Sequence, residues 1–178
     1  MSGTRASGAV TVRVIGLDPG LRHTGWGVIE ATGNRLRHLG DGVVSTDDKL
    51  PLAERLMQLH RGLTALLEGW RPDEAAVEET YVNRNPASAL KLGQARGVVM
   101  LAPALIGIPV REYGAMLVKQ SVVGTGAATK EQVQMMVRRL LPNARLARAD
   151  AADALAVSIC HAHHRATRLA WAKGLVGA

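Results

Sequence analysis

The stretch VRVIGLDPG, residues Val12–Gly20, is an apolar run of strand length that ends on a carboxylate and then turns. The β-branched residues of this run predict a strand, and Gly16 leaves room for another backbone or a ligand to come close. Pro19 and Gly20 supply the dihedral angles of a tight turn. Ligand sites in open α/β sheets lie beyond the carboxyl ends of strands, so Asp18 is a site candidate, although an ordinary turn residue is the alternative.

Length and composition indicate one globular domain. The chain has 178 residues, 47% of them hydrophobic, and no Phe, so aliphatic side chains must fill the core. The only cysteine, Cys160, excludes an intrachain disulfide and is typical of a reducing compartment, so we expect a cytoplasmic protein. The longest apolar stretch, Val98–Val110, is too short to span a membrane, and no signal peptide is recognisable.

The balance of charge points to a polyanionic partner. The chain carries 22 basic and 15 acidic residues, for a formal net charge of +7. A basic surface with a few acids at special places is what a nuclease needs, since cations bind phosphates and carboxylates bind a metal ion.

The first part of the chain predicts a meander. Strands are expected over Val12–Leu17, His23–Glu30 and Arg35–Thr46. Gly33 and Asn34 form the second hairpin turn, and Gly40 and Gly42 are expected at a bulge or a sheet edge.

The remainder alternates helices with two further strands. Helices are expected over Leu52–Trp70, Ala87–Ile106 with a break or bend near Pro103, Gly114–Val122, a segment capped by Thr129 and Gln132, and Ala149–His163; strands are expected over Glu74–Glu78 and Val110–Tyr113. These elements predict an α/β fold with a mixed five-stranded sheet flanked by helices. We expect a single domain over residues 1–178, with flexible tails at 1–11 and about 168–178.

Four acids are predicted to converge. If the strands that end at Asp18 and Glu78 run parallel in the middle of the sheet, their carboxylates meet at one edge. Asp150 and Asp153 are three residues apart and share a helix face. The alternative for this second pair is a helix cap and a first-turn acid that suits the helix dipole.

The chemistry of these ligands favours a hard cation. Carboxylate oxygens without a nearby His or Cys suit Mg²⁺ or Mn²⁺ rather than zinc. A pair of such ions about 4 Å apart activates water on one side of a phosphodiester and stabilises the leaving oxygen on the other.

Five blocks of sequence resemble the Holliday-junction resolvases of the RuvC type, members of the ribonuclease H-like superfamily. The resemblance covers almost all of residues 12–163. Its blocks are Ile15–Trp26 (IGLDPGLRHTGW), Ala76–Tyr81 (AVEETY), Ser88–Gly97 (SALKLGQARG), Val118–Gly124 (VKQSVVG) and Ala149–Ala156 (ADAADALA). Several long blocks in the same order are far more specific than any single block.

The resemblance implies roles for seven residues. It implies a structure-selective endonuclease that resolves four-way DNA junctions by paired, metal-dependent cuts, with two Mg²⁺ ions per site and Mn²⁺ as a substitute. It places the metal ligands on Asp18, Glu78, Asp150 and Asp153, the basic residues at the scissile phosphates on Lys119 and Lys130, and a base-stacking aromatic on Tyr81. Glu79 stands where the family more commonly has a neutral residue and is the alternative ligand, but the position in the motif favours Glu78.

The resemblance also implies partners. The family is a homodimer, and the helix that holds Gly93 and Gly97 resembles its dimer surface, since glycines four apart let another helix come close. A branch-migration helicase complex is the further partner that the family implies.

Three other functions remain alternatives. They are a ribonuclease H-like nuclease acting on RNA or other branched DNA, an actin-like ATPase domain, and a non-catalytic junction-binding protein. The chain is short for the ATPase fold, and a binding protein has no need of four acids. His161, His163 and His164 form either a metal cluster or a set of polar residues near a helix end.

Overall fold

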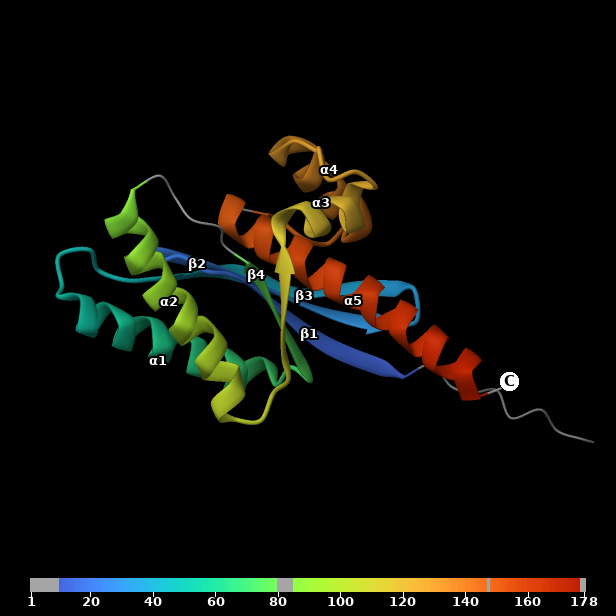
Figure 1. The fold of residues 1–178 in the computed structure, drawn as a ribbon, viewed down its shortest axis with the longest axis horizontal. Helices are drawn as coiled ribbons and strands as arrows, with labels where there is room; N and C mark the ends of the chain where they lie inside the picture. The colour runs from blue at the N-terminus through green and yellow to red at the C-terminus, as the bar shows by residue number, and fades with distance from the viewer. Residues whose placement is uncertain (1–9, 80–84, 147, 177–178) are drawn as a thin grey trace, which may run out of the picture.

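The computed structural model describes residues 10–79, 85–146 and 148–176, with side chains described as far as Trp171. Its elements are β1 (Thr11–Asp18), β2 (His23–Thr32), β3 (Arg35–Ser45), α1 (Leu52–Trp70), β4 (Glu74–Glu79), α2 (Pro86–Leu105), β5 (Val110–Gly114), α3 (Ala115–Val123), α4 (Lys130–Leu140) and α5 (Ala149–Val176). Figure 1 shows their arrangement. No helix in the described part of the chain has the length and apolar character needed to cross a bilayer.

The five strands form one mixed sheet, in the order β3-β2-β1-β4-β5. Strand β1 pairs antiparallel with β2 and parallel with β4, and β4 pairs parallel with β5. The predicted fold class and the central, parallel placement of β1 and β4 are therefore confirmed.

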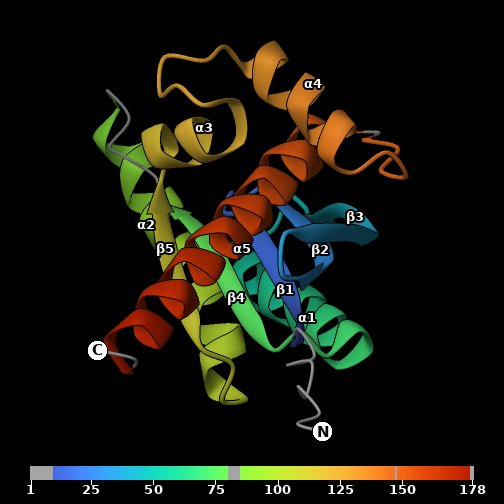
Figure 2. The same cartoon turned by 90° about the vertical axis from the view of Figure 1, so that its right-hand side faces the viewer.

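Helices cover both faces of the sheet (Figures 1 and 2). One apolar cluster joins Ile15, Leu17 and Val77 to α1 and α2. A second cluster joins Val14 and Ala76 to α3, α4 and α5. Since side chains of a strand alternate between faces, the apolar runs of β1 and β4 are buried on both sides, as their continuous hydrophobicity predicts.

Local sequence signals set several element ends. The predicted helix Leu52–Trp70 is confirmed at both ends. Helix α4 begins with the predicted capping box, in which the Thr129 side chain accepts from the Gln132 N–H and the Gln132 side chain accepts from the Thr129 N–H. The meander's irregularity lies beside Gly40, since β2 pairs Val28 with Gly40 and Ile29 with His38, which leaves Leu39 as the extra residue.

Two helices differ from the sequence prediction. Helix α2 continues through Pro103 to Leu105 instead of breaking at the proline, which lies in the final turn of the helix. Helix α5 runs to Val176 rather than ending at His163, so residues 168–176, expected in a tail, are helical. No proline follows His163, and Arg165 bonds to Glu74 on β4 at 2.7 Å, which ties this part of the helix to the sheet.

Three glycines let α5 lie directly on the sheet. A Cβ atom at Gly16 would come 2.0 Å from the carbonyl oxygen of Ala154, and one at Gly25 would come 2.0 Å from the carbonyl oxygen of Asp150. A Cβ atom at Gly27 would come 2.5 Å from the side chain of Leu155. The close approach expected at Gly16 is therefore made by the backbone of another element.

We expect Gly16→Ala to destabilise the fold by about 3 kcal/mol, because the helix must move away from the sheet to admit one methyl group. Gly69→Ala is the matched control, since Gly69 lies in α1 with nothing within 4 Å of its Cβ position. That change should be neutral or stabilising by up to about 1 kcal/mol, as alanine favours helix. Urea unfolding followed by circular dichroism measures both; equal stabilities would contradict the packing argument.

Candidate active site

Asp18 and Glu78 lie side by side at the carboxyl ends of the two central strands. The parallel register pairs Gly16 with Ala76 and Leu17 with Val77, so the next residues of the two strands are Asp18 and Glu78. A direct hydrogen bond joins their carboxyl groups. The meeting of these two acids, predicted from the chain order of the strands, is what the structure shows.

Strand alternation separates Glu78 from Glu79. Ala76 packs on the α5 side of the sheet, whereas Val77 packs on the α1 and α2 side. Glu78 shares the face of Ala76, and therefore points toward α5, while Glu79 belongs to the opposite face. Glu78, but not Glu79, therefore lies on the face of the sheet that α5 covers.

The first turn of α5 brings the other two acids to the same edge. Helix α5 begins at Ala149, so Asp150 is its second residue and not the N-cap that the alternative interpretation required. The backbone of Asp150 lies over Gly25, which is the partner of Asp18 in the sheet. Asp150 and Asp153 both act electrostatically on Asp18.

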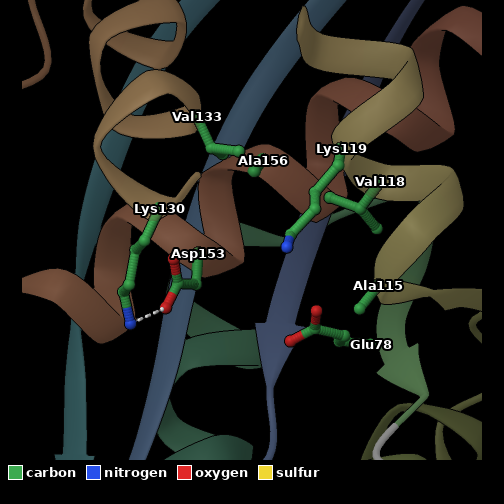
Figure 3. A pocket seen from close by; sticks show the side chains of 8 residues that line it. All are labelled: Glu78, Ala115, Val118, Lys119, Lys130, Val133, Asp153 and Ala156. Carbon is green, nitrogen blue, oxygen red and sulfur yellow. Dashed lines mark ion pairs between the residues drawn. The ribbon is translucent and has the colours of Figure 1, made fainter. Parts of the chain in front are cut away.

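Two lysines lie at the same site. A pocket of about 190 Å³ is lined by Glu78, Ala115, Val118, Lys119, Lys130, Val133, Asp153 and Ala156. The Lys130 ammonium bonds to Asp153 at 2.7 Å, and the Lys119 side chain points into the space between Asp153 and Glu78 (Figure 3). Residues from β4, α3, α4 and α5 thus converge, as the sequence predicted for Glu78, Lys119, Lys130 and Asp153.

The neighbouring acids make each other harder to ionise. Burial and the neighbouring Glu78 raise the pKa of Asp18 to about 8, and Asp153 and Asp150 add to that rise. Burial also raises the pKa of Glu78, although its hydrogen bond with Asp18 and the charges of Lys130 and Lys119 oppose the shift. Burial and mutual repulsion thus favour retention of a proton shared between the two carboxyl groups.

The donor set fits a hard divalent cation. Asp18, Glu78, Asp150 and Asp153 offer only carboxylate oxygens, and a cation among them would replace the shared proton and relieve their repulsion. Within the described residues, no three His, Cys, Asp or Glu side chains already stand in the arrangement of a metal site. Instead, Asp153 pairs with Lys130 at 2.7 Å, and Asp150 lies 3.7 Å from Arg148.

A buried threonine holds the turn after Asp18. The Thr24 hydroxyl donates to the Gly20 carbonyl at 2.7 Å and accepts from the Gly20 N–H at 3.2 Å. Thr24 is fully buried. Sequence reasoning gave Thr24 no role at the site, although it shares a strand face with Trp26 and Val28, two and four residues further on, which marks its hydroxyl as facing inward.

Two further predictions from the sequence concern Tyr81 and the three histidines. Tyr81, expected to stack on a base, lies outside the described residues. The histidines are not at a helix end, because α5 continues to Val176 and leaves them in its interior. His161 bonds to Tyr113 and Glu74, and His163 and His164 bond to Ser121, so they link elements of the fold.

Comparison with known proteins gives one consistent family. The family model described as "Crossover junction endodeoxyribonuclease RuvC" matches residues 14–161. Proteins of that same name from Granulibacter bethesdensis and Rhodospirillum rubrum are 70% and 65% identical to this chain over 166 residues. Those alignments cover 93% of this chain in both cases, and 93% and 98% of the relatives.

Solved structures agree with the sequence comparison. T. thermophilus RuvC in complex with a Holliday junction substrate superposes with a TM-score of 0.82 at 39% identity, covering 88% of this chain and 96% of that one. The yeast mitochondrial Holliday junction resolvase Ydc2 has a TM-score of 0.63 at 13% identity, covering 88% of this chain and 81% of that one, and so shares the fold alone.

The shared proton predicts how metal binding depends on pH. With the pKa of Asp18 near 8, a cation that binds at pH 7 must displace about one proton per site. Affinity for Mg²⁺ should rise by up to about tenfold per pH unit below pH 8 and level off above it. Calorimetric titration in two buffers of different ionisation enthalpy measures the released proton. Asp18→Asn should release markedly less, and a wild-type protein that releases none would contradict the shared proton.

Proposed function

The chain belongs to the RuvC family of crossover junction endodeoxyribonucleases, and we propose that Asp18, Glu78, Asp150 and Asp153 are the metal ligands with which it cuts four-way DNA junctions. The observation that carries this assignment is the convergence of these acids from β1, β4 and α5 at one sheet edge. The ions are Mg²⁺, two per site, with Mn²⁺ as a substitute.

The residues divide the chemistry between them. Asp18, Glu78, Asp150 and Asp153 would hold a pair of ions, which would supply an activated water on one side of the phosphodiester and stabilisation of the leaving oxygen on the other. The carboxyl pair of Asp18 and Glu78 would release its shared proton to solvent, which frees both groups to act as ligands. Lys130 leaves Asp153 for a phosphate oxygen, and Lys119 offers its charge to the same phosphodiester. Cleavage is thereby coupled to a rearrangement of ion pairs within the site.

The substrate is proposed from the family and from charge. The solved relative from T. thermophilus is described in complex with a Holliday junction. The net charge of +7 suits the DNA arms, and Tyr81 is proposed to stack on a base at the opened junction centre. The protein is proposed to act in recombination and repair in the cytoplasm, together with a branch-migration helicase complex.

Helix α2 has the surface that a homodimer needs. Leu90, Gly93, Gly97, Leu101 and Leu105 follow one another at steps of three or four residues and form one stripe of the helix. The three leucines are more than half exposed. Nothing described within this chain lies within 4 Å of a Cβ atom at either glycine. A two-fold dimer through this stripe presents two sites to the two symmetric strands of a junction.

Removing one negative charge at a time tests the ligand assignment. Asp18→Asn, Glu78→Gln, Asp150→Asn and Asp153→Asn should each bind a synthetic four-way junction in Ca²⁺ about as well as wild type, since the basic surface is unchanged. Each should cut it in Mg²⁺ at least about a hundredfold more slowly, because misplacing a reacting group by 1 Å costs that much. Single-turnover nicking of an end-labelled junction measures the rates.

Glu79→Gln is the matched control for that series. It makes the same chemical change one residue away, on the opposite face of the sheet, and should cut at nearly the wild-type rate. Loss of cutting in Glu79→Gln together with normal cutting in Glu78→Gln would reverse the assignment. Normal cutting by Asp150→Asn would remove Asp150 from the site.

A bulky side chain at Gly97, in the middle of the stripe on α2, tests the dimer surface. Gly97→Leu should leave the fold of the single chain intact, since its Cβ position is open, yet should raise the dimer dissociation constant by about tenfold or more, which is 1.4 kcal/mol. Sedimentation velocity of wild type and variant at micromolar concentration measures this. A wild-type protein that sediments as a monomer would contradict paired cutting by a preformed dimer.

A further inference from the structure

A buried polar chain joins α5 to the two strands beside it. His161 on α5 has no exposed surface. Its Nδ1 lies 2.9 Å from the hydroxyl of Tyr113 on β5, and its Nε2 lies 2.5 Å from the carboxylate of Glu74 on β4. The Arg165 guanidinium donates to the other oxygen of Glu74 at 2.7 Å. The chain Tyr113–His161–Glu74–Arg165 is called the histidine bridge below.

Each hydrogen-bonding group of His161 has a partner when the ring is neutral. Burial lowers the pKa of His161, and the proximity of Arg168 and Arg111 lowers it further, against the opposing effect of Glu74. In the neutral ring, Nε2–H donates to Glu74 and Nδ1 accepts from the Tyr113 hydroxyl. A single orientation of the ring satisfies both bonds, so the histidine bridge is specific in its geometry.

The histidine bridge and the acids occupy two ends of the same strand–helix pair. Glu74 and Glu78 are four residues apart on β4, a span of about 13 Å. Asp153 and His161 are eight residues apart on α5, a span of about 12 Å. The two spans are nearly equal. When the bond between Glu74 and His161 aligns β4 and α5 at one end, Glu78 and Asp153 therefore come together at the other end, where both line the pocket.

Tyr113 extends the histidine bridge toward the acids and the lysines. Its backbone is the sheet partner of Glu78, so its side chain lies on the same face, in the cluster that includes residues of α5. His164 stacks on its ring at 5.7 Å and bonds through Nε2 to the Ser121 hydroxyl at 3.3 Å. Ser121 lies two residues after Lys119 on α3. The same histidine face of α5 therefore contacts β4, β5 and α3, which carry or adjoin Glu78 and Lys119.

We propose that His161 is a positioning residue. Through its bonds to Tyr113 and Glu74 it fixes the position of α5 along β4 and β5, and at that position Asp153 and Glu78 can bind the same pair of cations. The glycine contacts set how deeply α5 lies on β1 and β2, and two directional bonds from one rigid ring add a constraint on its position along β4 and β5. This inference rests on the ligand roles proposed for Glu78 and Asp153. His161 is fully buried and does not line the pocket that holds Glu78 and Asp153, so its role is indirect.

The test compares variants that break the histidine bridge with a variant that weakens the fold elsewhere. His161→Leu removes both bonds and keeps a buried apolar side chain, and Tyr113→Phe removes only the hydroxyl. His161→Gln can still donate to Glu74 from an amide nitrogen and serves as the conservative variant. Leu63→Ala is the control, since Leu63 is buried in the cluster on the opposite face of the sheet.

The measurements are the melting temperature, Mn²⁺ affinity without DNA by electron paramagnetic resonance, junction binding in Ca²⁺, and single-turnover cutting against Mg²⁺ concentration. We expect His161→Leu to bind junctions within about twofold of wild type but to bind Mn²⁺ at least about tenfold more weakly and to cut up to about a hundredfold more slowly. His161→Gln should recover part of both losses. Leu63→Ala should match wild type in both, although its melting temperature falls.

Mn²⁺ affinity and cutting by His161→Leu equal to those of Leu63→Ala would overturn the proposal. If His161→Leu does not fold, Tyr113→Phe decides, because its packing is preserved: unchanged Mn²⁺ affinity there also overturns the proposal, and weakened affinity supports it. Asp153→Asn in the same assays separates this inference from the proposed function. Wild-type cutting by Asp153→Asn would show that the ligand assignment itself is wrong.

Discussion

The contact of α5 with strands β1 and β2 is the constraint on which the site depends. At Gly16 and Gly25 the helix backbone comes so close that a single methyl group would collide with a carbonyl oxygen 2.0 Å away. Only at this depth does the first turn of the helix lie level with the end of β1. The glycines are thus required by packing, and the packing sets where Asp150 and Asp153 lie relative to Asp18.

Placing these acids together has an electrostatic cost. Carboxylates brought out of water and next to one another resist ionisation, and the pKa of Asp18 near 8 expresses that cost. The protein offsets part of it with a proton shared between Asp18 and Glu78 and with an ion pair between Lys130 and Asp153. Both devices are replaceable by divalent cations and phosphates. We infer that the carboxylates repel one another in the free protein and that bound metal and DNA relieve this repulsion, which is the physical basis of the activity.

Much of this could be predicted from the sequence, because the informative signals were local. The strand ending at Asp18, the helix Leu52–Trp70 and the capping box of Thr129 follow from periodicity and turn chemistry, and the structure confirms them. The meeting of Asp18 with Glu78 required only that two apolar strands run parallel. Strand alternation places Glu78 and Glu79 on opposite faces of the sheet. Which of these faces α5 covers depends on the packing partners of each face, which one sequence does not contain.

Features that depend on contacts between distant segments could not be predicted. The bond between Arg165 and Glu74 joins residues 91 apart, so the contact that ties this part of α5 to the sheet is not visible in the local sequence. The partners of His161 lie on β4 and β5, and without them three histidines within four residues kept a metal cluster as an alternative. Thr24 likewise acquires a role only once the turn at Gly20 has folded back onto it.

The position of Mn²⁺ in crystals of the protein, found from anomalous scattering, tests directly whether the four acids bind the metal. We expect strong peaks enclosed by the carboxylates of Asp18, Glu78, Asp150 and Asp153, with Lys130 turned away from Asp153. Peaks elsewhere on the protein, or a Mn²⁺-soaked site in which Asp18 and Glu78 still share their hydrogen bond, would contradict it.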